Sequence, residues 1–151
     1  MEKTVAIFLH MQDDQPGYIS DYLSKNNISH KLVRLFNGDQ IPDINEVCGL
    51  VFMGGTMSVN DGLDWLNEEI ALIKEAVKRN IPILGHCLGG QLISVALGAK
   101  VISNPHEEIG WHYCSKETNE ASKEWLKLSL IHISEPTRRY AIAYAVFCLK
   151  K

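Results

Sequence analysis

One stretch near the middle of the chain constrains its fold more than any other. Residues 81–84 form a short apolar run that ends at Gly85, and an apolar pattern with helical spacing begins at Leu88. A short, bounded apolar run is typical of a buried strand. Between the two patterns lies Cys87, with one glycine two positions before it and Gly89 two positions after it. We therefore predict a strand, a tight turn and a helix, with a cysteine at the turn.

This spacing is the cysteine form of the Gly-x-nucleophile-x-Gly turn, in which the central residue adopts a strained backbone conformation. The flanking residues must be small because neighbouring backbone passes close to them. A thiol at a helix N-terminus is favoured as thiolate, and the N–H group of Leu88 could donate to a developing oxyanion. We predict that Cys87 is a nucleophile. The alternative is a buried structural cysteine beside a glycine-rich turn.

The rest of the chain alternates between strand and helix patterns. The predicted strands are residues 4–9, 31–36, 49–53, 81–84, 100–103 and 109–114, and the predicted helices are residues 18–26, 64–79 and the one after Cys87. Such alternation predicts an α/β domain with an open, mostly parallel sheet flanked by helices. Ligand sites in these sheets lie beyond the carboxyl ends of the strands.

The helix predicted over residues 64–79 is amphipathic. Asp64 is its expected N-cap, and its expected buried stripe consists of Leu66, Ile70, Ile73 and Val77. Glu69 is expected to face water together with the other charged residues of the helix. Outside this helix, His10 is interpreted as a residue at a strand end and His30 as a surface residue.

Two further features accompany Cys87. Gly54 and Gly55 end the strand predicted over residues 49–53. They are either a plain turn or a place where backbone N–H groups approach a substrate, since no Cβ intervenes. Gln91 lies four residues after Cys87 and therefore on the same helix face. It is either a surface amide or a hydrogen-bonding contact to a substrate.

At these residues the chain resembles a known family. The segment Gly85-His86-Cys87-Leu88-Gly89-Gly90-Gln91-Leu92 is similar to the G-x-C-x-G-x-Q signature of class I glutamine amidotransferases. Residues 51–59 and 107–111 resemble the branch called GMP-synthase-like. The resemblance implies a flavodoxin-like fold, attack of Cys87 on the side-chain amide of glutamine, and release of ammonia and glutamate through a thioester. It also implies that Gly55 and Leu88 form an oxyanion hole, that Gly54, Gly55 and Gln91 bind substrate, and that neither a metal nor a cofactor is required.

The general base of that family is a histidine followed two residues later by a glutamate, near the C-terminus. Here His132 and Glu135 are spaced one residue too far apart, and the His-x-Glu match at His106 lies in a different part of the family pattern. The resemblance therefore implies that activity is lost if this pair is absent.

From about Ser129 the chain resembles translated sequencing-adapter DNA. We predict a partial amidotransferase-like domain over residues 1–128 and a foreign or divergent tail over residues 129–151, in which residues 140–149 could form a strand or a helix.

Composition limits the partners. The 151 residues carry a net charge of −3, which does not favour nucleic acid, and no apolar run is long enough to span a membrane. Four scattered cysteines and no recognisable leader favour the cytoplasm. We expect a small-molecule substrate, either glutamine or a γ-glutamyl compound, and an ammonia-accepting partner enzyme. The alternatives are a γ-glutamyl peptidase, a catalytically inactive binding domain, and a redox sensor or chaperone-like protein.

Overall fold

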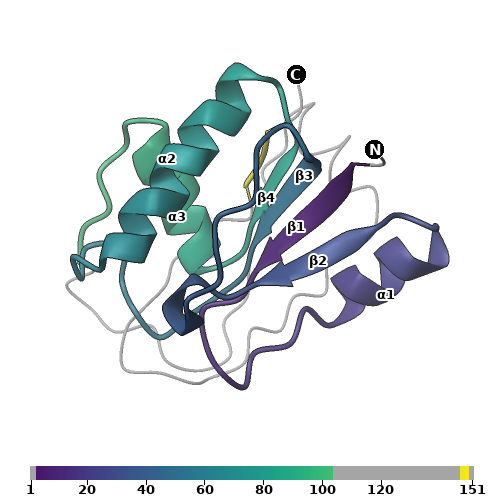
Figure 1. The fold of residues 1–151 in the computed structure, drawn as a ribbon. Coiled ribbons are helices and arrows are strands. Elements are labelled where there is room, and N and C mark those ends of the chain that lie inside the picture. The colour runs from purple at the N-terminus through teal and green to yellow at the C-terminus, as the bar shows by residue number, and fades with distance from the viewer. Residues whose placement is uncertain (1–2, 104–146, 150–151) are drawn as a thin grey trace, which may run out of the picture. The chain divides into compact units, whose positions relative to one another are not determined.

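The computed structural model describes residues 3–103 and 147–149, and these form a parallel sheet with one added strand (Figure 1). The strands are β1 (Thr4–Phe8), β2 (His30–Val33), β3 (Val47–Phe52), β4 (Ile83–Gly85) and β5 (Phe147–Leu149). Their order is β2-β1-β3-β4-β5, and the first four are parallel, whereas β5 pairs antiparallel with β4. The predicted open, mostly parallel α/β sheet is confirmed.

Helices cover both faces of this sheet. They are α1 (Tyr18–Lys25), α2 (Asp64–Lys78) and α3 (Leu88–Ala96). Figure 1 shows α2 and α3 on one face and α1 on the other. Parallel strands covered on both faces are apolar throughout, which explains the continuous apolar runs of the sequence. Within the described part, no helix is long and apolar enough to cross a membrane.

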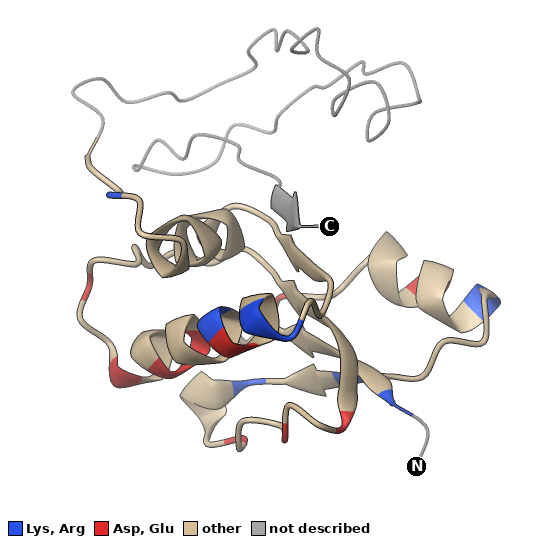
Figure 2. Cartoon of the chain, turned by 90° about the horizontal axis from the view of Figure 1, so that it is seen from above, with Lys and Arg blue, Asp and Glu red and all other residues tan. Residues whose placement is uncertain are grey.

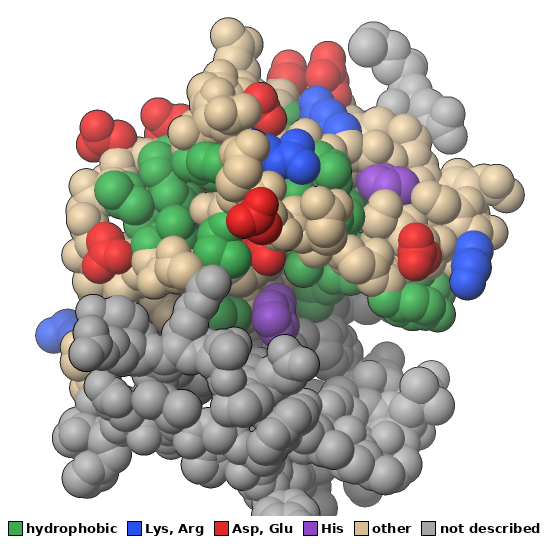
Figure 3. Space-filling view, turned by 90° about the horizontal axis from the view of Figure 1, so that it is seen from below, with side chains coloured by type: hydrophobic (Ala, Val, Ile, Leu, Met, Phe, Trp, Pro, Cys, Tyr) green, Lys and Arg blue, Asp and Glu red, His purple; other side chains and the backbone are tan. Residues whose placement is uncertain are grey.

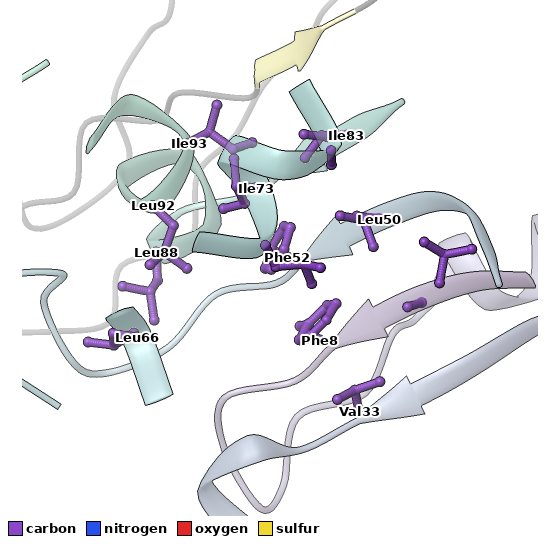
Figure 4. Packing of buried hydrophobic residues seen from close by; sticks show 14 residues of the cluster. Phe8, Val33, Leu50, Phe52, Leu66, Ile73, Ile83, Leu88, Leu92 and Ile93 are labelled. Atoms are coloured by element: carbon purple, nitrogen blue, oxygen red, sulfur yellow. The ribbon is translucent and has the colours of Figure 1, made fainter. Parts of the chain in front are cut away.

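Side chains of each strand alternate between two hydrophobic clusters. On β1, Ala6 and Phe8 point to the cluster under α2 and α3, whereas Ile7 points to the cluster that α1 covers. Phe8 stacks on Phe52 of the adjacent strand with ring centroids 4.6 Å apart (Figure 4). This stacked pair and Leu88 at the start of α3 are fully buried, so the core extends to the carboxyl ends of β1 and β3.

Two strand predictions are wrong in this structure. The strand predicted over residues 31–36 ends at Val33, because Leu35–Asn37 form a 3-10 turn that closes on Gly38 with a φ of 88°. Only glycine adopts this conformation readily. The strand predicted over residues 100–103 is absent, since residues 101–103 are irregular. The strand predicted over residues 109–114 lies outside the described residues.

Helix α2 differs from its prediction at two acidic residues and in part of its buried stripe, since Leu72 and Ala76 are buried whereas Ile70 and Val77 are only partly buried. Asp64 is the first helical residue rather than the N-cap, which is Leu63. Its carboxylate still lies in the first turn, where it faces the positive end of the helix dipole. Glu69 is buried instead of facing water, because it follows Leu66 by three positions and precedes Ile73 by four. Other charged residues of both signs remain along this longest helix (Figure 2).

Candidate active site

The turn between β4 and α3 has the strained geometry predicted for a nucleophile. The strand ends at Gly85, the helix begins at Leu88, and Cys87 has φ 56° and ψ −109°. Positive φ is uncommon for residues other than glycine and asparagine. The two other described non-glycine residues with positive φ, Asn27 and Asn80, are asparagines. A cysteine held in this conformation is therefore a feature that the surrounding structure imposes.

The flanking glycines are required by close backbone packing. A Cβ atom added to Gly85 would lie 2.6 Å from the backbone of Gly89, and one added to Gly89 would collide with the carbonyl group of Phe52. The His86 N–H donates to the Phe52 carbonyl at 2.9 Å, and the Gly89 N–H donates to the Met53 carbonyl at 3.2 Å. These two hydrogen bonds thus connect the turn at Cys87 directly to the end of β3.

The second glycine turn lies beside Cys87. A Cβ atom added to Gly54 would lie 3.6 Å from Cys87 Sγ, and one added to Gly55 would lie 2.9 Å from Leu88 Cδ2. Among the described residues, the backbone N–H groups of Gly55 and Leu88 have no hydrogen-bond acceptor. The structure therefore brings the two predicted glycine turns together, and both turns contain backbone N–H groups that have no acceptor among the described residues.

Hydrophobic side chains gather on the surface around the strand ends. Figure 3 views the described part from the lower side of Figure 1, toward which β1 to β3 point, and shows these side chains among acidic, basic and histidine side chains. In the loop after β3, Met57, Val59 and Leu63 are partly buried and pack against the core. An apolar wall with a few polar groups is typical of a small-molecule site.

Gln91 connects α3 to this loop. Its Oε1 accepts a hydrogen bond from the Val59 N–H at 3.2 Å. Because this bond uses the amide oxygen, the amide NH2 is the part of Gln91 that could donate to a ligand. The Gln91 side chain therefore contacts the loop that follows Gly55. The substrate contact predicted for Gln91 stays a prediction.

A buried polar pair that was not predicted from the sequence lies next to the glycine turn. His10, which follows β1, and Glu69 of α2 are only 2% and 1% exposed. His10 Nε2 lies 3.0 Å from Glu69 Oε2, and His10 Nδ1 lies 3.0 Å from the carbonyl oxygen of Gly54. The imidazole also stacks on Trp65 at a centroid distance of 5.7 Å. The position of Glu69 on the apolar stripe of α2 was the available signal.

The contacts of His10 determine where its protons lie. A carbonyl oxygen only accepts hydrogen bonds, so Nδ1 carries a proton and donates it to Gly54. One further proton lies between Nε2 and Glu69. Burial works against the imidazolium, but the hydrogen bond and charge of Glu69, together with hydrogen bonds to the backbone of Gly54 and Met53, outweigh it, so the pKa of His10 is raised above 6.5. Burial likewise raises the pKa of the Glu69 carboxyl group above 4.5.

These shifts predict a pH dependence of stability. Both raised pKa values mean that the folded chain binds protons more tightly than the unfolded chain. The His10 contribution is complete below its unfolded pKa of 6.5 and is lost as the pH rises through the higher folded-state value. Urea unfolding from pH 6.5 to about 9 should therefore show wild type losing stability relative to the His10→Gln/Glu69→Gln double variant. A difference that stays constant or grows with pH would contradict this expectation.

Of the histidines weighed as general bases, His86 alone lies within the described residues. His86 adjoins Cys87 in the sequence, and both His86 Nδ1 and Cys87 Sγ would lie 3.6 Å from a Cβ atom added to Gly54. His106, His132 and Glu135 lie outside the described residues. The described part of the chain thus contains the strained turn at Cys87 and the N–H groups of Gly55 and Leu88, and the roles of nucleophile, oxyanion donors and base stay predictions.

Comparison with known proteins identifies the class to which this fold and site belong. The family model of class-I glutamine amidotransferases matches residues 16–142. The chain belongs to the class-I glutamine amidotransferase family, as its motifs predicted.

Individual relatives are consistent with this family. The glutamine amidotransferase-like protein YfeJ of Salmonella typhimurium is 37% identical over 115 residues, which are 72% of this chain and 48% of that protein. The glutamine-hydrolyzing GMP synthase of Limosilactobacillus reuteri is 40% identical over 83 residues, which are 55% of this chain and 14% of the synthase. The chain thus spans about half the length of the former relative, and a much smaller share of the latter.

Solved structures agree with the sheet topology. A glutamine amidotransferase from Methylobacillus flagellatus superposes with a TM-score of 0.81 and 33% identity, covering 97% of this chain and 58% of that one. A glutamine amidotransferase from Thermotoga maritima gives a TM-score of 0.67 and 30% identity, covering 74% and 50% of the two chains. The described sheet is therefore a class-I glutamine amidotransferase fold.

Proposed function

We propose that the site accepts the side-chain amide of glutamine and transfers its acyl group to Cys87. The observation that carries this proposal is the meeting of the strained Cys87 turn with two unpaired N–H groups, those of Gly55 and Leu88, among the described residues. Such donors stabilise charge that develops on a carbonyl oxygen during nucleophilic attack. Family membership supports the choice of glutamine as the amide.

The proposed reaction has two halves. The Cys87 thiolate attacks the amide carbon, forming the S–C bond and an oxyanion that Gly55 and Leu88 hold. The C–N bond then breaks, and the nitrogen leaves as ammonia after taking up a proton. Water hydrolyses the thioester, which regenerates the thiol and releases glutamate. The first half needs a group that gives a proton to the leaving nitrogen, and the family resemblance assigns this role to a histidine.

The fate of the ammonia is part of the proposal. Several of the similar proteins are GMP synthases or their subunits, named as glutamine-hydrolyzing. We propose that the ammonia passes to an acceptor enzyme or domain.

Labelling of Cys87 tests the nucleophile without requiring turnover. The probe is the chloromethyl ketone analogue of glutamine, in which CO–CH2Cl replaces the side-chain amide. Attack by the thiolate forms an S–C bond and releases chloride, so intact mass should show one adduct. The adduct should be absent in Cys87→Ala and should persist in Cys48→Ala, since Cys48 is exposed and lies outside the site.

Competition decides the substrate class. Glutamine should slow labelling of Cys87, and γ-glutamyl peptides should slow it less. Stronger protection by the peptides would favour the γ-glutamyl peptidase alternative. A folded protein that forms no adduct would contradict the proposal and leave an inactive binding domain as the better account. Rapid peroxide oxidation of Cys87 without amide-dependent protection would favour a redox role.

A further inference from the structure

The buried pair of His10 and Glu69 has no part in the proposed reaction, yet it contacts the backbone of the glycine turn. His10 Nδ1 donates to the Gly54 carbonyl oxygen at 3.0 Å, and Glu69 holds the opposite nitrogen at 3.0 Å. Both side chains are almost fully buried, so desolvating them costs stability. A buried polar pair kept at this cost next to a site suggests a role other than stabilising the core.

Peptide geometry connects this hydrogen bond to the oxyanion donor. The carbonyl of Gly54 and the N–H of Gly55 belong to one peptide unit, and the described residues contain no cis peptide bond. In a planar trans peptide the C=O and N–H bonds point in opposite directions. Holding the Gly54 carbonyl against His10 therefore directs the Gly55 N–H away from His10.

The two successive glycines alone do not fix the orientation of the peptide unit between them. Glycine is conformationally permissive, so the peptide unit between Gly54 and Gly55 could rotate at little steric cost. A side-chain hydrogen bond restrains it, because His10 Nδ1 donates to the Gly54 carbonyl oxygen. The space around Gly55 is tight, since an added Cβ atom would lie 2.9 Å from Leu88 Cδ2 and 3.1 Å from His10 Cβ. Among the described residues, the hydrogen bond is the contact that specifies which way the carbonyl points.

We propose that His10 and Glu69 are positioning residues that hold the Gly54–Gly55 peptide so that the Gly55 N–H serves the oxyanion hole at Cys87. The inference rests on the proposed function, because an oxyanion hole has meaning only if Cys87 attacks a carbonyl group. Glu69 acts through His10: it accepts from or donates to Nε2, which keeps the proton on Nδ1 and fixes the ring.

Two reagents separate this role from general stability. The chloromethyl ketone analogue of glutamine passes through an oxyanion when Cys87 attacks its carbonyl carbon. Iodoacetamide alkylates the same thiolate by displacing iodide from a CH2 group, without an oxyanion. The ratio of the two labelling rates therefore reports the oxyanion hole. A merely structural defect changes both rates together.

Matched variants at position 10 isolate the contact with Gly54. Both variants carry Glu69→Gln as well, because the amide introduced at position 69 can donate a hydrogen bond to residue 10 and leaves no buried charge. The protein with Glu69→Gln alone is the reference for their labelling rates. His10→Asn places an amide NH2 where Nδ1 was, whereas His10→Gln places it where Nε2 was. The first can still donate to the Gly54 carbonyl, and the second can reach only residue 69.

We expect the ratio of the two labelling rates to fall in His10→Gln and not in His10→Asn. His10→Gln should lower the rate ratio by at least about tenfold, since losing one oxyanion donor typically costs more than this. Glu69→Gln and His10→Asn should stay within about threefold of wild type. Equal ratios in the two position-10 variants would overturn the proposal while leaving the proposed function intact. Absence of glutamine-protected labelling in wild type would instead defeat the proposed function itself.

A measurement on unmodified protein covers the case in which the variants do not fold. The 15N NMR signals of the His10 ring should show a protonated Nδ1 in the folded chain from about pH 5 to 9, because the Gly54 carbonyl can only accept. A folded protein in which Nδ1 loses its proton while Nε2 keeps one would contradict the proposed contact.

Discussion

Gly89→Ala should unfold the nucleophile turn and lower the free energy of unfolding by about 3 kcal/mol. The added Cβ would collide with the carbonyl of Phe52, and the atoms in the way belong to the backbone of β3, not to a flexible side chain. Relief requires α3 to move off the sheet, which breaks the hydrogen bonds from His86 and Gly89 to the end of β3. Urea denaturation measures the loss, and labelling of Cys87 should be abolished.

The matched control is the same substitution at Gly49. This glycine is also buried, but a Cβ atom added there would meet Val5 Cγ2 at an ordinary 3.5 Å. Gly49→Ala should change the free energy of unfolding by less than about 1 kcal/mol, because it also restricts the unfolded chain. Equal stabilities of the two variants would show that the close packing of α3 on β3 does not explain the glycine at position 89.

Removing either member of the buried pair should be the second large effect. His10→Leu and Glu69→Leu should each cost about 3 to 5 kcal/mol, because each leaves the other polar group buried without its partner. The double variant should cost less than the sum of the two, since no orphaned charge remains. Urea denaturation of the four proteins in this double-mutant cycle gives the coupling energy.

A control on the same helix tests whether burial is the cause. Glu68 neighbours Glu69 but is exposed, so Glu68→Leu should change the free energy of unfolding by less than about 0.5 kcal/mol. Strictly additive effects of His10→Leu and Glu69→Leu would show that the two side chains do not stabilise each other. In that case the role proposed for Glu69, acting through His10, would also lose its support.

Local sequence determined the parts of the site that depend on neighbouring residues. The strand, the glycines around Cys87 and the start of α3 lie within one continuous segment, so spacing and residue type were enough to predict them. The apolar runs predicted the parallel sheet for a related reason. A strand that is buried on both faces is a continuous apolar run, so it can be predicted from its own residues without knowing which strands pair with it. The predicted boundaries were wrong by a few residues at the end of β2 and at the start of α2, where a single turn or cap residue determines where the element ends or begins.

Tertiary structure alone decided which polar groups surround that segment. His10 lies 59 residues from Glu69 and 44 residues from Gly54, and no local pattern relates positions so far apart. Glu69 looked like a solvent-facing residue because charge is normally exposed, and only the partner from β1 makes its burial tolerable. The chain's own sequence therefore specified the nucleophile turn. The contact of α2 with the segment that follows β1 supplied the pair for which we propose the positioning role, because hydrogen bonds between distant segments form only when the fold brings them together.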